Sequence, residues 1–265
     1  FAIIPISFSV SPFMVFTEGM LAWPPDPEAW SIRWYRNMIG DCSADVVSST
    51  VPCSTKWMKG TVNSFYIGII ATVIATALGT LAALGLSRPH MPYKGLIMAI
   101  LISPMIVPLI ITAAGMFFFY ARINLVYTFT GVILAHVALA TPFVVITVTA
   151  TLVGFDMNMV KAAQSLGAKP MRTFFKVIMP LILPGIISGA LFAFITSFDE
   201  VVIVMFMASI DQLTIPKQMW AGIRQEISPV ILCMATCLVL LSIFLLTTVE
   251  LLRRRSEKLR GIKAR

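Results

Sequence analysis

Long apolar stretches without a charged residue dominate this sequence. Between consecutive charged side chains, the uncharged stretches are residues 1–17, 60–87, 95–121, 123–155, 177–198 and 227–249. All but the first exceed the ~20 residues that an α-helix needs to cross ~30 Å of hydrocarbon. They are apolar on every side, whereas a strand of a membrane barrel would alternate in polarity over about ten residues. The pattern therefore predicts membrane-spanning helices.

We expect an all-α fold: a polytopic membrane protein with six transmembrane helices in one domain, residues 1–265. The predicted spans are about 1–17, 61–87, 95–120, 130–154, 178–207 and 228–251, and a cytoplasmic loop covers 155–177. Pro104 and Pro108 interrupt the third span and should kink it. Because the chain opens at Phe1 with a short first stretch, we expect part of that span and a cytoplasmic segment to precede this numbering.

The composition excludes most soluble classes of protein. Hydrophobic residues make up 58% of the chain and charged residues only 12%, with a mean hydropathy of +0.91. In an ordinary soluble domain, about a quarter of the residues are charged. A soluble enzyme, a disordered tail and a disulfide-rich secreted module are therefore excluded.

The basic residues predict the orientation in the membrane. The loops 88–94 and 156–176 and the tail 253–265 carry 13 of the 20 lysines and arginines. These segments are cytoplasmic by the positive-inside rule, so both termini face the cytoplasm. The net charge of +8 needs no nucleic acid as a partner, because a basic tail is attracted by anionic membrane lipid.

Cysteine and histidine positions bear on redox state and metal binding. Cys42 and Cys53 lie in the polar external segment before the second span, where they form either a disulfide, which we favour, or two free thiols. Cys233 and Cys237 are one helical turn apart in the last span and are interpreted as packing residues. No histidine accompanies them, so we predict no metal site. His136, in the fourth span, is expected to be a hydrogen-bonded packing residue.

The cytoplasmic loop contains a short helix of its own. Residues 161–166 are good or acceptable helix formers, Gly167 stands where a helix would end in a left-handed residue, and Pro170 prevents continuation. The small side chains of Ala162 and Ala163 would let another protein approach closely. A plain interfacial helix between two spans is the alternative that this pattern leaves open.

The stretch KAAQSLGAKPMRTFFKVIMPLILP closely resembles the EAA signature of binding-protein-dependent ABC importer permeases, the type I importer family. The matching positions are Ala162, Ala163, Gly167, Val177, Met179 and Pro180. Lys161 departs from the signature, since it takes the place of the usual glutamate. The resemblance implies a coupling helix that docks in a groove of a separate ATPase subunit and is formed by Lys161, Ala162, Ala163, Gln164, Ser165, Leu166, Gly167 and Ala168.

The flanking sequences narrow the resemblance. HVALATPFVVITVTATLVGFD and SGALFAFITSFDEVVIVMFMASIDQLTIPKQMWAGIRQEISP are similar to the second permease subunit of spermidine/putrescine-type importers, although the external stretch around residues 42–53 is longer than is usual there. This implies a non-enzymatic permease of the inner (plasma) membrane. Its partners would be a homologous permease, an ATPase dimer and an extracytoplasmic substrate-binding protein. The chain has no GxxxxGK[ST] phosphate loop, so ATP would be bound by the ATPase and no cofactor by this chain.

Asp199 and Glu200 are an acidic pair about twenty residues into the fifth span. A carboxylate near the centre of a bilayer costs roughly 2.5 to 3.5 kcal/mol on insertion scales, so the pair needs compensation. Adjacent helical positions point about 100° apart, so both cannot share a narrow face unless the helix unwinds there. We expect one or both to line the substrate path and attract a polyamine. The alternative is that they lie at the external interface and pair with Lys217 or Arg224.

Residues 211–229 form a short amphipathic segment that should lie along the outer surface, where it either caps the cavity or contacts an external partner. Other cargoes also remain open: iron, sulfate, phosphate or amino acids. A secondary carrier would need coupling-ion ligands and usually an internal repeat, and a membrane-embedded hydrolase would need a polar nucleophile and base. Neither set of features is evident in the sequence.

Overall fold

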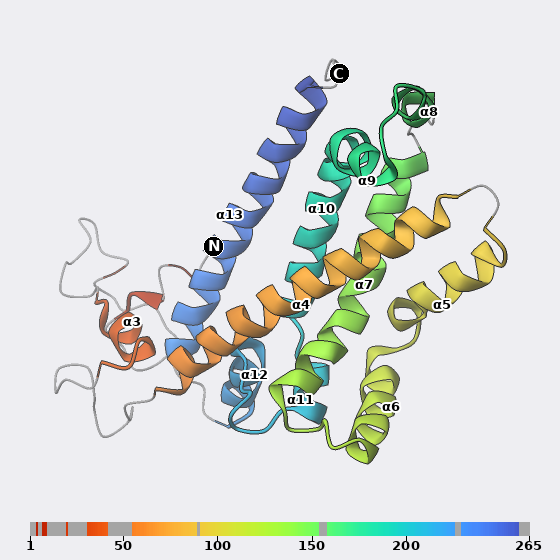
Figure 1. The fold of residues 1–265 in the computed structure, drawn as a ribbon. Coiled ribbons are helices and arrows are strands. Elements are labelled where there is room, and N and C mark those ends of the chain that lie inside the picture. The colour runs from red at the N-terminus through yellow and green to blue at the C-terminus, as the bar shows by residue number, and fades with distance from the viewer. Residues whose placement is uncertain are drawn as a thin grey trace. The chain divides into compact units, whose positions relative to one another are not determined.

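The structure is a computed structural model that describes residues 4, 7–9, 20, 31–41, 55–88, 91–153, 158–225 and 229–259, with backbone only at 249 and 252–259. Most of the predicted first span, 1–17, lies outside these residues. All secondary-structure elements that these residues form are helices, which confirms the all-α class (Figure 1). The elements are α3 Arg33–Met38, α4 Lys56–Leu86, α5 Lys94–Ile106, α6 Leu109–Arg122, α7 Phe129–Val153, α8 Asn158–Ser165, α9 Pro170–Thr173, η2 Phe174–Ile178, α10 Met179–Phe198, α11 Val202–Met207, α12 Ile215–Gln225 and α13 Pro229–Leu259.

Four segments of the described chain are long and apolar enough to cross a membrane: Lys56–Leu86, Phe129–Val153, Pro170–Phe198 and Pro229–Thr248. A fifth candidate is the pair α5 and α6, which is bent by 103° at its break. Pro108 explains the break, because a proline disfavours helical backbone in the residue before it, and Val107 has an extended ψ of 137°. The predicted kink in the third span is therefore a sharp bend between two helices.

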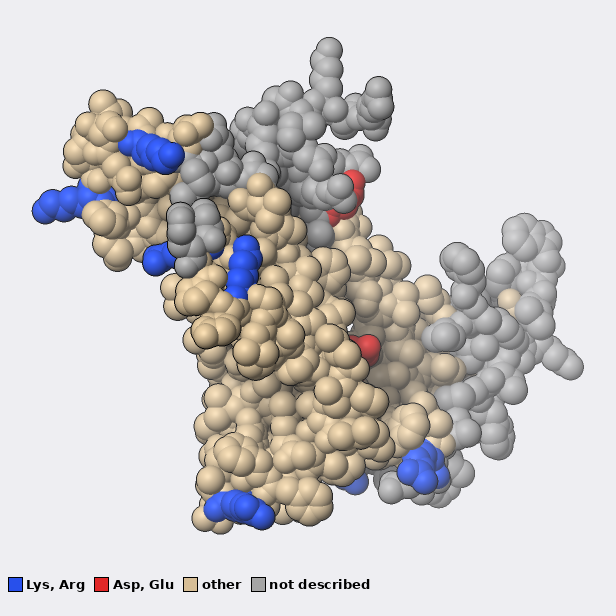
Figure 2. Space-filling model, turned by 90° about the vertical axis from the view of Figure 1, so that its right-hand side faces the viewer, with Lys and Arg blue, Asp and Glu red and all other residues tan. Residues whose placement is uncertain are grey.

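The exposed surface is largely apolar. Charged side chains are isolated on the face that Figure 2 shows, and uncharged residues cover most of its described area. Large apolar side chains are exposed instead, among them Val73 at 63%, Ile100 at 62% and Phe118 at 69%. Such a surface suits a lipid environment, because exposed apolar side chains are unfavourable in water and favourable in hydrocarbon.

Contacts divide the chain into two compact units, Phe1–Phe65 with Ser209–Thr247 and Tyr66–Ala208 with Thr248–Arg265. In the second unit α7 is the central helix. It packs along α10, and many of its residues are fully buried, including Val144 and Val148. The helix α4 also contacts α7 in this unit, where Gly79 lies against Val144. The hydrophobic core of this unit therefore surrounds α7.

Small residues allow these helices to approach closely. A Cβ built on Gly189 of α10 would lie 2.5 Å from the Thr147 hydroxyl and 3.0 Å from the Cα of Val144. A Cβ on Gly185 would collide with Thr151 in the same way. Close backbone contact at small residues is the usual way in which membrane helices gain packing energy, since lipid provides no hydrophobic drive between them.

We expect Gly189→Ala to destabilise the protein, because the added methyl group forces α7 and α10 apart. Overpacking of a well-packed core costs about 1 to 3 kcal/mol. The measurement is the melting temperature in detergent, which should fall clearly. Gly115→Ala is the matched control, since a Cβ there meets no atom within 4 Å. Equal melting temperatures for the two variants would refute this account of the α7 and α10 packing.

In the first unit the beginning of α4 holds the loop before α12. The side-chain amide nitrogen of Asn63 donates to the carbonyl oxygens of Asp211 at 2.7 Å and Leu213 at 2.9 Å. The hydroxyl oxygen of Ser64 accepts the N–H of Ile215, the first residue of α12, at 2.9 Å. Asn63 and Ser64 are both buried. The bond to Ser64 satisfies an N–H group that the start of α12 leaves open, and the bonds from Asn63 satisfy two carbonyl groups of the loop before it.

Asn63→Asp should loosen this loop, because it sets a carboxylate against two carbonyl oxygens. We expect backbone amides of residues 209–218 to exchange hydrogen at least tenfold faster, as measured by mass spectrometry. Lys59→Ala is the control, since the ion pair between Lys59 and Asp211 (2.9 Å) is exposed and such pairs contribute only about 0 to 1 kcal/mol. If the lysine variant exchanged as fast as the aspartate variant, the ion pair and not Asn63 would hold the loop.

Candidate functional site

The predicted loop helix is present as α8. Its C-terminal end has the bonds that close a helix on a left-handed glycine: Gly167 has φ +79°, its N–H donates to the Gln164 carbonyl, and the N–H of Ala168 donates to Ala163. This is the Schellman arrangement, and it confirms the predicted role of Gly167 as the residue that ends the helix.

The outer face of α8 is available to another protein. Val160 is buried and fixes the helix to its own unit. Most of the predicted coupling residues are exposed, and the remaining two, Ala163 and Ala168, are half-buried. Leu166 is 88% exposed, the most exposed large apolar residue in the described chain. The helix therefore presents small residues and one projecting leucine on its exposed face.

The structure separates the two residues of the acidic pair. Helix α10 ends at Phe198 and α11 begins at Val202, so the fifth span is broken where the carboxylates lie. Asp199 is exposed, whereas Glu200 is only 7% exposed. One carboxylate oxygen of Glu200 accepts the N–H of Ile203 at 2.8 Å. Glu200 thus caps the start of α11, and Asp199 is the one of the two that can meet a ligand without rearrangement.

His136 is a packing residue, as predicted. It is fully enclosed on α7, and its Nδ1 lies 2.7 Å from the hydroxyl of Ser197 on α10. Ser197 immediately precedes the end of that helix. The bond therefore fixes the end of α10 next to the break that carries Asp199.

The structure describes one of the two cysteine pairs. Cys42 and Cys53 lie outside the described residues. Cys233 and Cys237 are free thiols of α13, and Cys233 is buried with its sulfur 3.3 Å from the Ser7 carbonyl, which suits a packing residue. In the described part of the chain no three His, Cys, Asp or Glu side chains gather closely enough to hold a metal ion.

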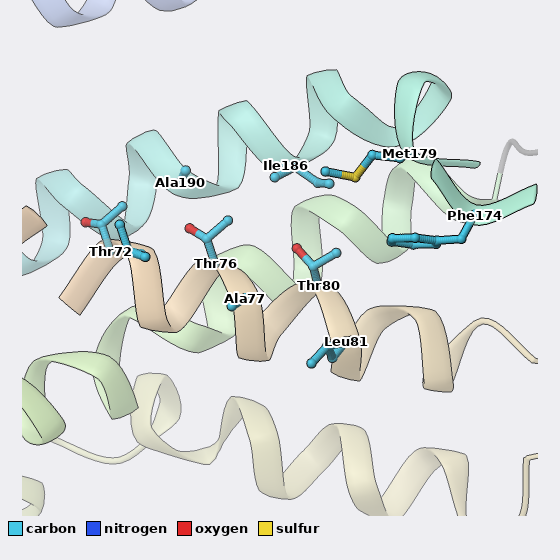
Figure 3. A pocket seen from close by; sticks show the side chains of 10 residues that line it. Thr72, Thr76, Ala77, Thr80, Leu81, Phe174, Met179, Ile186 and Ala190 are labelled. Atoms are coloured by element: carbon cyan, nitrogen blue, oxygen red, sulfur yellow. The ribbon is translucent and has the colours of Figure 1, made fainter. Parts of the chain in front are cut away.

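A groove that the sequence did not predict lies in the second unit, between α4, η2 and α10 (Figure 3). Its volume is about 500 Å³, it is open along one side, and its surface is almost wholly apolar. Three threonines of α4 line it at intervals of four residues: Thr72, Thr76 and Thr80. The interval was visible in the sequence as a stripe along one helix face, but nothing there distinguished it from ordinary packing.

Comparison with known proteins identifies the family. Residues 62–258 match the family described as "Binding-protein-dependent transport system inner membrane component". The chain is 29% identical over 200 residues to the spermidine/putrescine transport system permease protein PotC of Haemophilus influenzae, covering 76% of this chain and 78% of that protein. It is also 29% identical over 215 residues to the putrescine transport system permease protein PotI of Escherichia coli K12, covering 78% and 72%.

A solved structure shows the same fold. A chain of a bacterial ABC transporter that imports the acidic polysaccharide alginate superposes with a TM-score of 0.60 at 14% identity, over 83% of this chain and 71% of that one. The shared fold, the helical core and the family match over most of the sequence all indicate the same family. The chain belongs to the family of inner membrane components of binding-protein-dependent transport systems, the permeases of ABC importers.

Proposed function

We propose that this chain is the permease subunit of an ATP-driven importer of polyamines, with spermidine and putrescine as the cargo. The observation that carries this proposal is the similarity to two polyamine permeases over more than three quarters of the chain. The exposed carboxylate of Asp199, at a break in a membrane helix, supports a cationic cargo. Broken helices that carry polar groups at membrane depth are typical of substrate pathways.

The chain would work as one half of a translocation path. A homologous permease forms the other half, an ATPase dimer lies on the cytoplasmic side, and an external binding protein delivers the cargo. Both termini face the cytoplasm, as the distribution of lysine and arginine indicates. ATP is bound by the ATPase subunits, because this sequence lacks a phosphate-binding loop.

Residues 161–168 would transmit the work of ATP hydrolysis. The hydrogen-bonded end of α8 and the exposed Leu166 support docking in a groove of the ATPase. When ATP closes the ATPase dimer, the docked helix moves and the spans shift from an inward-open to an outward-open state. Nucleotide can drive this change only to the extent that the two states bind it with different affinity.

The experiment is uptake by liposomes that contain both permeases and the ATPase, with ATP inside and the binding protein outside. We expect radioactive spermidine and putrescine to accumulate only when ATP and the binding protein are both present. Accumulation of a sugar or an amino acid but not of an amine would reject the cargo. Amine uptake without ATP would reject the importer and favour a secondary carrier.

A further inference from the structure

Among the described residues, the hydroxyl groups of the three threonines that line the groove have no hydrogen-bond partner. A threonine in a membrane helix can donate to the carbonyl one turn earlier, as Thr141, Thr147 and Thr151 of α7 do at 2.6 to 2.9 Å, although Thr149 of that helix does not. The hydroxyl oxygens of Thr72, Thr76 and Thr80 are buried and have no such bond among the described residues. Unsatisfied polar groups are costly in a membrane, where water does not replace the missing bond.

All three threonine side chains point from α4 toward α10 (Figure 3). Thr80 is only 8% exposed, so its polar group is enclosed within the wall of the groove. The present surface of the groove is made of carbon, since each oxygen is shielded from water. A threonine in a helix has two accessible χ1 rotamers, and a turn about this bond exchanges the methyl group for the hydroxyl. The wall can therefore offer oxygens to a ligand.

The spacing of the hydroxyls indicates the chemistry of the ligand. Residues four apart on an α-helix rise by about 6 Å along its axis, so the oxygens form a row with that interval. A linear aliphatic amine with a four-carbon spacer carries its nitrogens at about the same interval, with methylene groups between them. Ammonium groups donate hydrogen bonds and hydroxyl oxygens accept them, while the methylene groups match the apolar wall.

We propose that Thr72, Thr76 and Thr80 form a second, uncharged binding site for the aliphatic amine cargo, on the cytoplasmic side of the acidic break. This inference rests on the proposed function. The groove runs along α10 away from Asp199: Gly68, one turn before Thr72, faces Phe194 and Phe198, and the far end of the groove is lined by Phe174 and Met179.

Neutral oxygens suit a site from which the cargo must leave again. A path conducts only when its sites bind strongly enough to be entered and weakly enough to be left. The residues that line the groove include no carboxylate, which would hold a dication or trication tightly. The open side leaves the remaining N–H groups of the amine free for water or for the partner permease.

Isosteric substitutions in the reconstituted importer test this site. Thr72→Val, Thr76→Val and Thr80→Val together remove the hydroxyls at constant volume, and we expect putrescine uptake to fall at least tenfold while the complex still assembles. The three Thr→Ser changes keep the hydroxyls and should retain uptake within threefold. Thr141→Val on α7, outside the groove, should also leave uptake unchanged. Normal uptake by the triple valine variant would overturn the inference.

Labelling of a cysteine tests occupancy directly. In Thr76→Cys complexes we expect a cationic thiol reagent to modify residue 76, and saturating putrescine to slow this reaction at least fivefold. Leu78→Cys, on the same helix but outside the groove lining, should react at a rate that putrescine does not change. Labelling of residue 76 that putrescine does not slow would overturn the site. So would the absence of any labelling, since another helix would then fill the groove. If the proposed cargo is wrong, the wild-type importer will not take up amines. If only the proposed site is wrong, the wild-type importer will take up amines and the variants will not behave as expected, so the two failures are distinguishable.

Discussion

Leu166→Asp is expected to abolish ATP-driven uptake and to release the ATPase from the purified complex. Leu166 is 88% exposed, so the change costs this chain almost nothing in folding, as is usual for exposed positions. In the assembled importer the same side chain would enter a groove of the ATPase, and an unpaired buried carboxylate there costs about 3 kcal/mol or more, roughly a hundredfold in affinity. The measurement is the amount of ATPase that co-purifies with the permease.

A matched control is Ile210→Asp, which replaces another highly exposed apolar residue, at 81%, in the loop before α12. Its complexes should retain the ATPase at the wild-type ratio. If both variants lost the ATPase, the effect of Leu166→Asp would reflect general damage. If neither did, α8 would not be the docking element, and the plain interfacial helix would be the better interpretation.

Asp199→Asn should raise the KM for polyamine uptake about tenfold or more, with normal assembly. The change removes one charge and keeps the shape, and hydrogen bonds to charged groups contribute about 1.5 to 3 kcal/mol. Glu200→Gln should have a much smaller effect, because its amide oxygen can still accept the N–H of Ile203. Glu200→Ala removes that cap and should lower stability by about 1 kcal/mol.

The contrast between the two positions is the informative result. KM is measured for putrescine with each single variant at a fixed amount of complex. An unchanged KM in Asp199→Asn would show that this exposed carboxylate does not meet the cargo. A larger KM effect in Glu200→Gln than in Asp199→Asn would show that Glu200 leaves the start of α11 to bind substrate, contrary to the division of roles proposed above.

The fold class could be predicted because lipid imposes a simple rule on the sequence. Uncharged stretches longer than ~20 residues must be helices, and the described structure has helices where the stretches around residues 61–87 and 130–154 lie. The end of α8 was also predictable, since a glycine at the position of a left-handed cap is a local signal that depends on no distant contact.

Tertiary geometry was not predictable in the same way. Pro108 predicted a kink, but the angle of 103° between α5 and α6 depends on the helices against which they pack. The acidic pair suggested that the helix could unwind, yet only the structure shows that Glu200 accepts the N–H of Ile203 and that Asp199 is the exposed member. The groove itself is tertiary: it exists because α10 lies opposite the face of α4 that carries Thr72, Thr76 and Thr80, whose hydroxyls have no partner within the described residues.

The most direct test of the account concerns the segment of residues 161–168. Complexes are purified with this segment either native or scrambled in order, and ATP hydrolysis is measured with and without the loaded binding protein. We predict that loaded binding protein stimulates hydrolysis in the native complex, and that the scrambled complex either fails to assemble or shows no stimulation. Full stimulation in a complex with the scrambled segment would contradict the claim that α8 couples this permease to its ATPase.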